Sequence, residues 1–365
     1  MRRYPKGWRF FCLINDAADH ASGFFTKRDD CVLFAIFVTM KVSILLPYYN
    51  AAPWIAETIG SIQGQSMSDW ELICINDFSN DITESIVLEL AKSDPRIKAF
   101  HNSSKGIIPA LQLALSKASA PYITRIDADD LMTPNRLKLM SEILDLATER
   151  TIVTGKVQYF SENGVSKGFL RYEQWINERI DQQDHYQQLY RECVIASPNW
   201  MAQRKEIVDL ALFDALRYPE DYDLVFQWFA NDFHIECVHE VTLHWRDHPT
   251  RTSRTSTNYA QAALFKLKID WFIRLHGKGK SIGILGAGTK GKLTTDYLAS
   301  QDRYFGWYDF QFDKFKGKQG ATEILDYRLI SEEALLICIY PPNIDELEAF
   351  LNSKGYFIGQ NAWYL

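Results

Sequence analysis

Short β-branched runs and stretches with helical apolar spacing alternate between residues 41 and 150, and few folds can accommodate that order. The apolar runs predict strands at 42–46, 70–75, 97–100 and 122–126. Helical spacing predicts helices at 56–62, 82–92, 107–118 and 135–150. Strands that alternate with helices predict an α/β fold, with a mostly parallel central sheet and helices on both of its faces.

Polar side chains follow three of these predicted strands. Ligands of parallel sheets bind outside the carboxyl ends of the strands, so we expect Asn50, Asp77 and Asp127 to converge on one crevice. In an extended strand Asp127 and Asp129 would face the same way, and paired carboxylates suit Mg²⁺ or Mn²⁺ together with substrate phosphates. A solvated turn or a helix cap is the alternative, because Asp is common there and Thr133-Pro134 follows.

Composition narrows the class of protein. With 47% hydrophobic and 24% charged residues the chain resembles a soluble globular protein, and its net charge of −6 argues against nucleic acid as a partner. The six cysteines are scattered without a Cys-x-x-Cys pair, which favours reduced thiols in the cytoplasm. The apolar run at 31–40 is too short for a membrane span and too late for a signal peptide. We expect residues 1–39 to form an extension outside the fold.

The chain after residue 150 is less regular. We expect strands at 151–160 and 235–244, and helices at 172–190, 206–212, 223–231 and 259–276. Residues 277–280 have the composition of a linker, and a new strand follows at 281–285. The expected organisation is therefore a first domain at 40–255, a connecting helix at 256–278 and a small α/β domain at 279–365.

A glycine-rich motif lies in the last of these segments. Gly286, Gly288 and Gly291 follow the predicted strand and open a helix, which is the context of a phosphate cradle. Asp309 ends the next strand, about where a ribose-binding acid belongs. The segment resembles half of a Rossmann unit, so it predicts nucleotide binding rather than a complete dehydrogenase. Tight packing of helix on strand is the alternative explanation for the glycines.

Four ordered motifs in the first domain resemble the nucleotide-binding half of the family 2 inverting glycosyltransferases of GT-A fold. They are Leu46-Pro-Tyr-Tyr-Asn50, Ser61-Ile-Gln-Gly-Gln65, Ile75-Asn-Asp-Phe-Ser-Asn-Asp81 and Ile126-Asp-Ala-Asp-Asp130. Further on, 219–224 is similar to the acidic motif of that family, and 245–248 to its closing Arg/His segment. The resemblance covers about residues 41–255 and favours a metal site over a solvated turn at Asp127 and Asp129.

The resemblance also implies roles for single residues. Donor-binding residues would be Pro47, Tyr49, Asn50, Asp77, Asp127 and Arg246. Ligands of Mn²⁺ or Mg²⁺ would be Asp127, Asp129 and His248. Asp77 would accept a hydrogen bond from the base, although Phe78 stands where the family often has Gly. A core position for Tyr49 and an ordinary structural hydrogen bond for His248 are the alternatives.

Inverting transfer needs a general base, because the acceptor hydroxyl must lose its proton as it attacks the anomeric carbon. Asp221 matches the acid that the family uses for this purpose. Glu220 and Asp223 are close competitors, and the three acids could instead favour a helix N-terminus. On the acceptor side we expect Trp200 and Glu220, although Trp200 could equally be a core residue.

The leading hypothesis is a metal-dependent inverting glycosyltransferase, with a nucleotide-sugar donor (a UDP-sugar) and a glycan or lipid-linked acceptor in surface polysaccharide synthesis. The alternatives are an NAD(P)-dependent oxidoreductase or a nucleotide-sugar sensor that uses the glycine-rich segment. A cytoplasmic location is expected. The basic, aromatic helix at 259–276 could also contact the inner face of a membrane, but packing with a solvated face is its more ordinary role.

Overall fold

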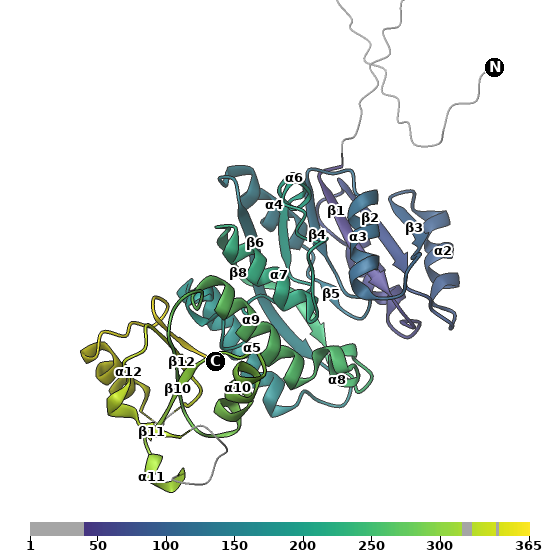
Figure 1. Cartoon of the computed structure of the whole chain (residues 1–365). Helices are drawn as coiled ribbons and strands as arrows, with labels where there is room; N and C mark the ends of the chain where they lie inside the picture. Colours follow the sequence, from purple (N-terminus) through teal and green to yellow (C-terminus); the bar gives the residue numbers. More distant parts are fainter. Residues whose placement is uncertain (1–39, 316–322, 341–342) are drawn as a thin grey trace, which may run out of the picture.

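The computed structural model describes residues 40–315, 323–340 and 343–365, so the expected extension at 1–39 lies outside the described residues. The described chain forms two lobes, each built on its own sheet (Figure 1). The larger lobe has an eight-stranded sheet in the order β3-β2-β1-β4-β7-β6-β8-β5, and the smaller a five-stranded sheet in the order β11-β10-β9-β12-β13.

The first half of the large sheet is parallel, as the alternating pattern predicts. Its elements are β1 (Val42–Tyr48), α1 (Ile55–Gln63), β2 (Trp70–Asn76), α2 (Thr83–Ser93), β3 (Ile97–His101), α3 (Ile107–Lys117), β4 (Tyr122–Arg125) and α4 (Arg136–Leu146). Strand β1 lies between β2 and β4, with Val42 opposite both Trp70 and Tyr122. All seven residues of β1 and all seven of β2 are buried, because helices cover both faces of the sheet.

The second half of the large sheet is mixed. It contains β5 (Leu131–Met132), β6 (Thr151–Phe160), α5 (Lys167–Gln182), β7 (Trp200–Gln203), α6 (Arg204–Asp209), α7 (Glu220–Ala230) and β8 (His234–Arg246), with a 3₁₀ turn at His185–Gln188. Strand β7 is antiparallel to β4 and β6, and β5 is antiparallel to β8. Neither β5 nor β7 was expected from the sequence.

Two predicted helices have different limits in the structure. Helix α4 ends at Leu146, where Ala147 turns extended, so the prediction to residue 150 is too long. Helix α5 begins at Lys167, where the Ser166 hydroxyl accepts from the Phe169 N–H at 3.4 Å, and it ends at Gln182, because Gln183 has a left-handed backbone. The prediction of a helix at 172–190 is therefore wrong at both ends, because local caps rather than apolar spacing decide them.

The chain crosses to the smaller lobe through α8 (Thr252–Thr255), a 3₁₀ turn at Thr257–Tyr259 and α9 (Gln261–Leu275). That lobe contains β9 (Ile282–Leu285), α10 (Thr289–Ser300), β10 (Phe305–Asp309), α11 (Phe312–Phe315), β11 (Leu325–Asp326), a 3₁₀ turn at Tyr327–Leu329, β12 (Ala334–Ile337), α12 (Ile344–Ser353) and β13 (Ala362–Tyr364). Its strands are all parallel. The predicted fold class is confirmed, whereas the exact domain limits stay a prediction.

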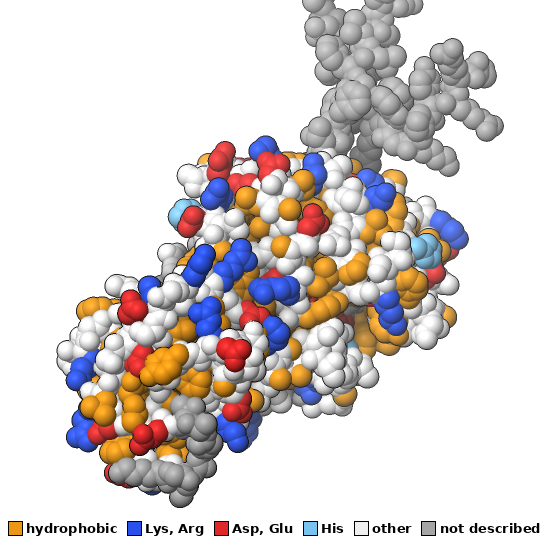
Figure 2. Space-filling view, in the orientation of Figure 1, with side chains coloured by type: hydrophobic (Ala, Val, Ile, Leu, Met, Phe, Trp, Pro, Cys, Tyr) orange, Lys and Arg blue, Asp and Glu red, His pale blue; other side chains and the backbone are white. Residues whose placement is uncertain are grey.

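Helix α9 has its aromatic side inside the molecule. Phe265, Trp271 and Phe272 are at most 5% exposed, so the packing alternative describes this helix and its apolar side is not free to lie on a membrane. Among the residues of the three described ranges, no helix is long and apolar enough to span a membrane. Figure 2 shows acidic, basic and apolar side chains mixed over one face, with Lys and Arg gathering near the middle of the molecule.

Candidate active site

The carboxyl ends of β1 and β2 form one wall of the site. The Asn50 side-chain oxygen accepts from the Asn80 N–H at 2.9 Å, which joins the two strand ends. The Asp77 carboxylate accepts from the Gly106 N–H at 2.9 and 3.0 Å and from the Asn102 amide at 2.8 Å. Tyr49 is 47% exposed, so it is not a core residue. The predicted donor residues on these strands therefore share one edge, with Pro47 buried in β1 beneath them.

The three acids after β4 lie on a turn rather than on a strand. Strand β4 ends at Arg125, and the Asp130 N–H donates to the Asp127 carbonyl at 3.2 Å. The expectation that strand alternation aligns Asp127 with Asp129 is therefore wrong, because the extended backbone stops first. The turn is tight and acidic: burial, followed by the charges of Asp129 and Asp127, raises the pKa of Asp130 well above its usual range. One Asp130 carboxylate oxygen is buried without a hydrogen-bond partner among the described residues.

Two of the predicted metal ligands lie together. The His248 Nε2 is 2.8 Å from Asp129 Oδ2, and the imidazole stacks on Trp54 with ring centroids 3.9 Å apart. The third, Asp127, instead pairs with Arg125 Nε at 2.8 Å. Across the described ranges, no group of three or more His, Cys, Asp or Glu side chains is arranged to hold a metal on its own. A cation at this turn would therefore need further ligands from water or a substrate.

Arg125 is a site residue that the sequence analysis left unassigned. Besides Asp127, its guanidinium reaches Glu220 Oε1 at 3.1 Å, so it joins the acidic turn to the start of α7. Glu220 is 1% exposed, and its other oxygen accepts from the Tyr259 hydroxyl at 2.5 Å. Arg125 and Asp127 are two residues apart, so strand alternation would place them on the same face, in agreement with the ion pair between them.

Two arginines of the closing segment have different surroundings. Arg246 supports the acidic turn with three hydrogen bonds. Its Nε donates to the Asp129 carbonyl at 2.7 Å, its backbone N–H donates to the Asp130 carboxylate, and its Nη2 donates to the Glu57 carboxylate. Through these contacts Arg246 supports the acidic turn, and its predicted contact with phosphate stays a prediction. Arg251 lies over the Trp245 ring at 5.2 Å, and its buried Nη1 lacks a partner among the described residues.

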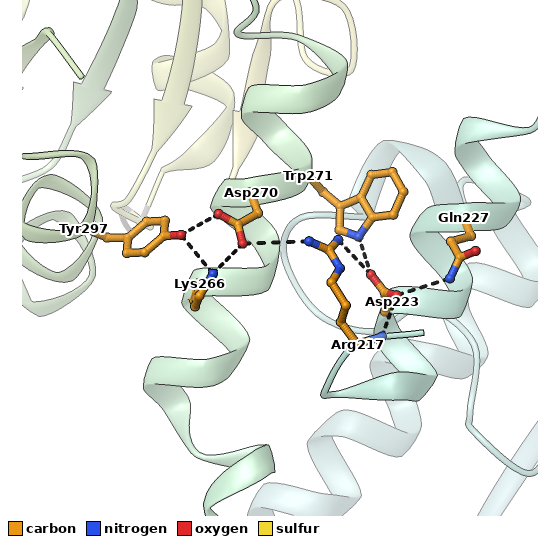
Figure 3. A network of polar contacts seen from close by, with 7 residues as sticks. All are labelled: Arg217, Asp223, Gln227, Lys266, Asp270, Trp271 and Tyr297. Carbon is orange, nitrogen blue, oxygen red and sulfur yellow. Dashed lines mark hydrogen bonds and ion pairs between the residues drawn. The ribbon is translucent and has the colours of Figure 1, made fainter. Parts of the chain in front are cut away.

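The three acids in the first turn of α7 have different partners. Asp223 is fully buried and accepts from Arg217 at 2.9 Å and from the Trp271 indole at 2.6 Å (Figure 3). Glu220 is engaged by Arg125 and Tyr259. Asp221 is partly exposed and accepts, among the described residues, from the Tyr222 N–H at 2.8 Å alone. Burial, followed by the charge of Glu220, raises the pKa of Asp221 to about 7.

Helix α7 is tied to the connecting helix and, through it, to the smaller lobe. Beyond the Asp223–Trp271 contact, Arg217 lies 3.8 Å from Asp270 on α9. Asp270 in turn accepts from the Tyr297 hydroxyl of α10 at 2.5 Å (Figure 3). The position of the helix that carries Asp221 therefore depends on contacts that extend into the second sheet.

Trp200 is not accessible to an acceptor. It is 2% exposed and packs edge-on against Phe213 and Trp228 at centroid distances of 6.4 and 5.4 Å. The core alternative thus describes Trp200, and the burial of Glu220 likewise removes it as an acceptor ligand. No local signal could reveal this burial, because an interior Trp and a sugar-stacking Trp have the same sequence pattern.

The glycine-rich motif of the smaller lobe is used largely for packing. A Cβ on Gly291 would lie 1.8 Å from the Gly286 carbonyl, whereas one on Gly288 would meet nothing within 4 Å. The Asp309 carboxylate accepts from the Ala287 N–H at 2.7 Å and from the Gln311 N–H at 2.6 Å. The acid predicted to bind a ribose therefore holds the glycine loop, beside a cavity of about 360 Å³.

Comparison with known proteins places this arrangement in a class. A crystal structure of Staphylococcus aureus TarS in complex with UDP-GlcNAc superposes with a TM-score of 0.51 over 77% of each chain, at 15% identity, which shows a shared fold. Residues 43–210 match glycosyl transferase family 2. The chain belongs to this family, and the resemblance seen in its motifs is confirmed.

Individual relatives agree with this assignment. WfgD of Escherichia coli, a UDP-Glc:alpha-D-GlcNAc-diphosphoundecaprenol beta-1,3-glucosyltransferase, is 30% identical over 188 residues, which are 50% of this chain and 67% of WfgD. The uncharacterized glycosyltransferase RT0329 of Rickettsia typhi is 29% identical over 60% of this chain and 67% of its own length. An uncharacterized glycosyltransferase of Rickettsia bellii is 31% identical over 50% of this chain, but the match spans 24% of that protein.

Proposed function

We propose that the protein transfers a sugar from a UDP-sugar to a hydroxyl group of a glycan or lipid-linked acceptor, with inversion at the anomeric carbon and Asp221 as general base. The observation that carries this proposal is the difference between the acids of α7. Glu220 and Asp223 are buried in ion pairs, whereas Asp221 is partly exposed, has no side-chain partner among the described residues and has a pKa of about 7. A base with that pKa is half-deprotonated at neutral pH.

The proposed reaction is a single displacement. The acceptor oxygen attacks the anomeric carbon on the face opposite the nucleoside diphosphate, and the bond from that carbon to the diphosphate oxygen breaks. Asp221 takes the proton of the attacking hydroxyl. One displacement inverts the configuration, and no sugar–enzyme bond is needed.

The donor would lie along the edge formed by β1 and β2. The exposed ring of Tyr49 offers a stacking surface for a base, and Lys105 lies 4.8 Å above this ring. Asp77 and Asn50 stand on the same edge, although Asp77 already binds the Gly106 N–H. The unpartnered Nη1 of Arg251 is better placed than Arg246 to meet a diphosphate. The UDP-Glc in the name of WfgD supports a uridine nucleotide.

A divalent cation, Mn²⁺ or Mg²⁺, fits the acidic turn. Asp129 and His248 would hold it, with Asp127 beside them, and diphosphate oxygens would complete the ligand set. Burial, followed by the charges of Asp129 and Asp127, raises the pKa of Asp130, and a cation would offset the repulsion among these three acids. When bound, the ion would stabilise negative charge on the departing diphosphate.

The acceptor class is proposed from the family and from WfgD, whose name gives a diphosphoundecaprenol-linked sugar as its acceptor. We therefore favour a role in surface polysaccharide synthesis. The oxidoreductase alternative is less well supported, because the Asp309 carboxylate already accepts from the Ala287 and Gln311 N–H groups. The sensor alternative is less well supported, because Asp221 has the raised pKa expected of a general base.

Nucleotide release from a panel of UDP-, GDP- and dTDP-sugars, with Mn²⁺ or with EDTA, tests the proposal. Release should require the metal and fall about 10²–10⁴-fold in Asp221→Asn and Asp129→Ala. Asp232→Asn is the matched control, since its side chain lies just beyond α7 and is 91% exposed. If the Asp221→Asn variant turned over at the wild-type rate, Asp221 would not be the general base. A product with retained anomeric configuration would refute the single displacement.

A further inference from the structure

A second cavity, of about 570 Å³, lies where the two lobes meet. Helix α5 and the segment around Arg191 form its wall on the side of the large lobe, and Lys290 and Tyr340 form its wall on the side of the small lobe. Its volume is within the range of small-molecule sites. We call it the interlobe pocket.

The interlobe pocket is cationic although the chain as a whole is acidic. Arg171, Arg191 and Lys290 line it, against the single carboxylate of Glu192. Neither arginine side chain has an ion-pair or hydrogen-bond partner among the described residues. Lys290 donates to the Leu365 main-chain oxygen at 2.9 Å and keeps further N–H donors.

Aromatic rings flank two of these cations, Arg191 and Lys290. The Arg191 guanidinium lies 5.9 Å from the Trp175 ring of the large lobe and 4.9 Å from the Tyr340 ring of the small lobe. Lys290 Nζ lies 4.9 Å from the same Tyr340 ring. A guanidinium between rings keeps its charge and its planar donors, which suit phosphate. Flat ring faces beside it suit the apolar face of a sugar.

The pocket adjoins the segment around His248. Tyr172 lines it, and the Tyr172 hydroxyl donates to the Cys193 carbonyl at 2.7 Å. Tyr172 also packs against Trp245, with ring centroids 6.2 Å apart, and Trp245 directly precedes Arg246, whose Nε donates to the Asp129 carbonyl. On the opposite flank, Phe169 lines the pocket and lies 4.7 Å from Arg254 of the segment after His248. The interlobe pocket therefore borders the segment of Trp245 to Arg254, which also carries His248.

We propose that the interlobe pocket is the acceptor subsite and that it binds a phosphate ester or diphosphate of the acceptor through Arg191 and Lys290. This inference rests on the proposed function, since it names the acceptor chemistry of the same enzyme. It also explains why the smaller lobe is present, because Lys290 and Tyr340 complete a site that the large lobe cannot form alone.

Binding of two phosphate probes to the full chain by isothermal titration calorimetry in EDTA, without donor, tests this inference. N-acetylglucosamine 1-phosphate represents a phosphorylated glycan and farnesyl diphosphate a lipid diphosphate, with N-acetylglucosamine as the neutral control. We expect at least one phosphate probe to bind, and Arg191→Gln or Lys290→Gln to weaken it about tenfold or more. Lys292→Gln is the matched control, because Lys292 is on the same helix but lines the other cavity.

Tighter binding of farnesyl diphosphate would identify a lipid-linked acceptor, and tighter binding of the sugar phosphate a phosphorylated glycan. Salt should weaken wild-type binding more than binding to the Arg191→Gln, Lys290→Gln double variant, which separates charge recognition from altered folding. Absence of binding by both probes, or equal affinity of wild type and double variant, would overturn the inference. The binding assay measures no turnover, so the two proposals can fail separately. Nucleotide release without probe binding would overturn the inference about the pocket and leave the proposed function standing. Probe binding without nucleotide release would support the pocket and count against the proposed function.

Discussion

Replacement of Asp221 by Asn should stabilise the protein at alkaline pH and abolish transfer. In the unfolded chain this carboxyl loses its proton near pH 3.8, but in the folded chain near pH 7, because burial and the charge of Glu220 outweigh the nearby Arg125. Between these values unfolding releases a proton, so the free energy of unfolding falls as pH rises and levels off above pH 7. Asn cannot titrate, and the variant lacks this loss.

A pKa difference of about 3 corresponds to about 4 kcal/mol, and solvent at the partly exposed carboxyl reduces the expected effect to about 2 kcal/mol. Urea unfolding of wild type and Asp221→Asn at intervals from pH 4 to pH 9 measures it. The difference in unfolding free energy should grow in favour of the variant up to about pH 7 and then stay constant. Wild-type turnover should rise through the same interval, since the base must be deprotonated. A stability difference that does not change with pH would refute the reasoning.

Three further predictions concern residues around the sites. Arg125→Met should destabilise the fold by about 3–5 kcal/mol in urea, because the buried Glu220 and the partly exposed Asp127 lose their shared cation, and a loss under about 1 kcal/mol would contradict this. Phe78→Gly should gain about 0.5–1 kcal/mol in the same assay, since Phe78 has a φ of 64° and is 50% exposed; destabilisation would show that its ring makes a needed contact. Gly291→Ala should lower the melting temperature by several degrees because the added carbon meets the Gly286 carbonyl, whereas Gly288→Ala should not, and equal melting of both variants would argue against the clash.

The first half of the fold could be predicted because its signals are local. The apolar runs that became β1 and β2 are buried throughout, so composition alone marks them as strands. The short strand at Trp200–Gln203 has no such signal; it exists because β4 and β6 offer edges on either side. Pairing partners of this kind are set by the tertiary structure, which a linear pattern does not record.

The candidate site divides in the same way. Motif spacing indicated the acidic turn and the acids of α7, but not which acid is free. That distinction depends on Arg125, 95 residues before Glu220, and on Trp271, 48 residues after Asp223. The resemblance implied a donor-binding role for Arg246, whereas its guanidinium contacts the Asp129 carbonyl and Glu57. Contacts between distant segments thus decide roles among residues of the same type.

Helix α9 bears on how such a protein could be divided or recombined. Its Trp271 fills the buried side of the helix that carries Asp221, while its Asp270 receives the Tyr297 hydroxyl from the second lobe. A chimaera that exchanges the smaller lobe should therefore be joined after Leu275 and keep α9 with the parent enzyme. It should also carry over a tyrosine at the position of Tyr297. Recombination of the smaller lobe could then change acceptor specificity, while the parental α9 keeps Asp221 in position for catalysis.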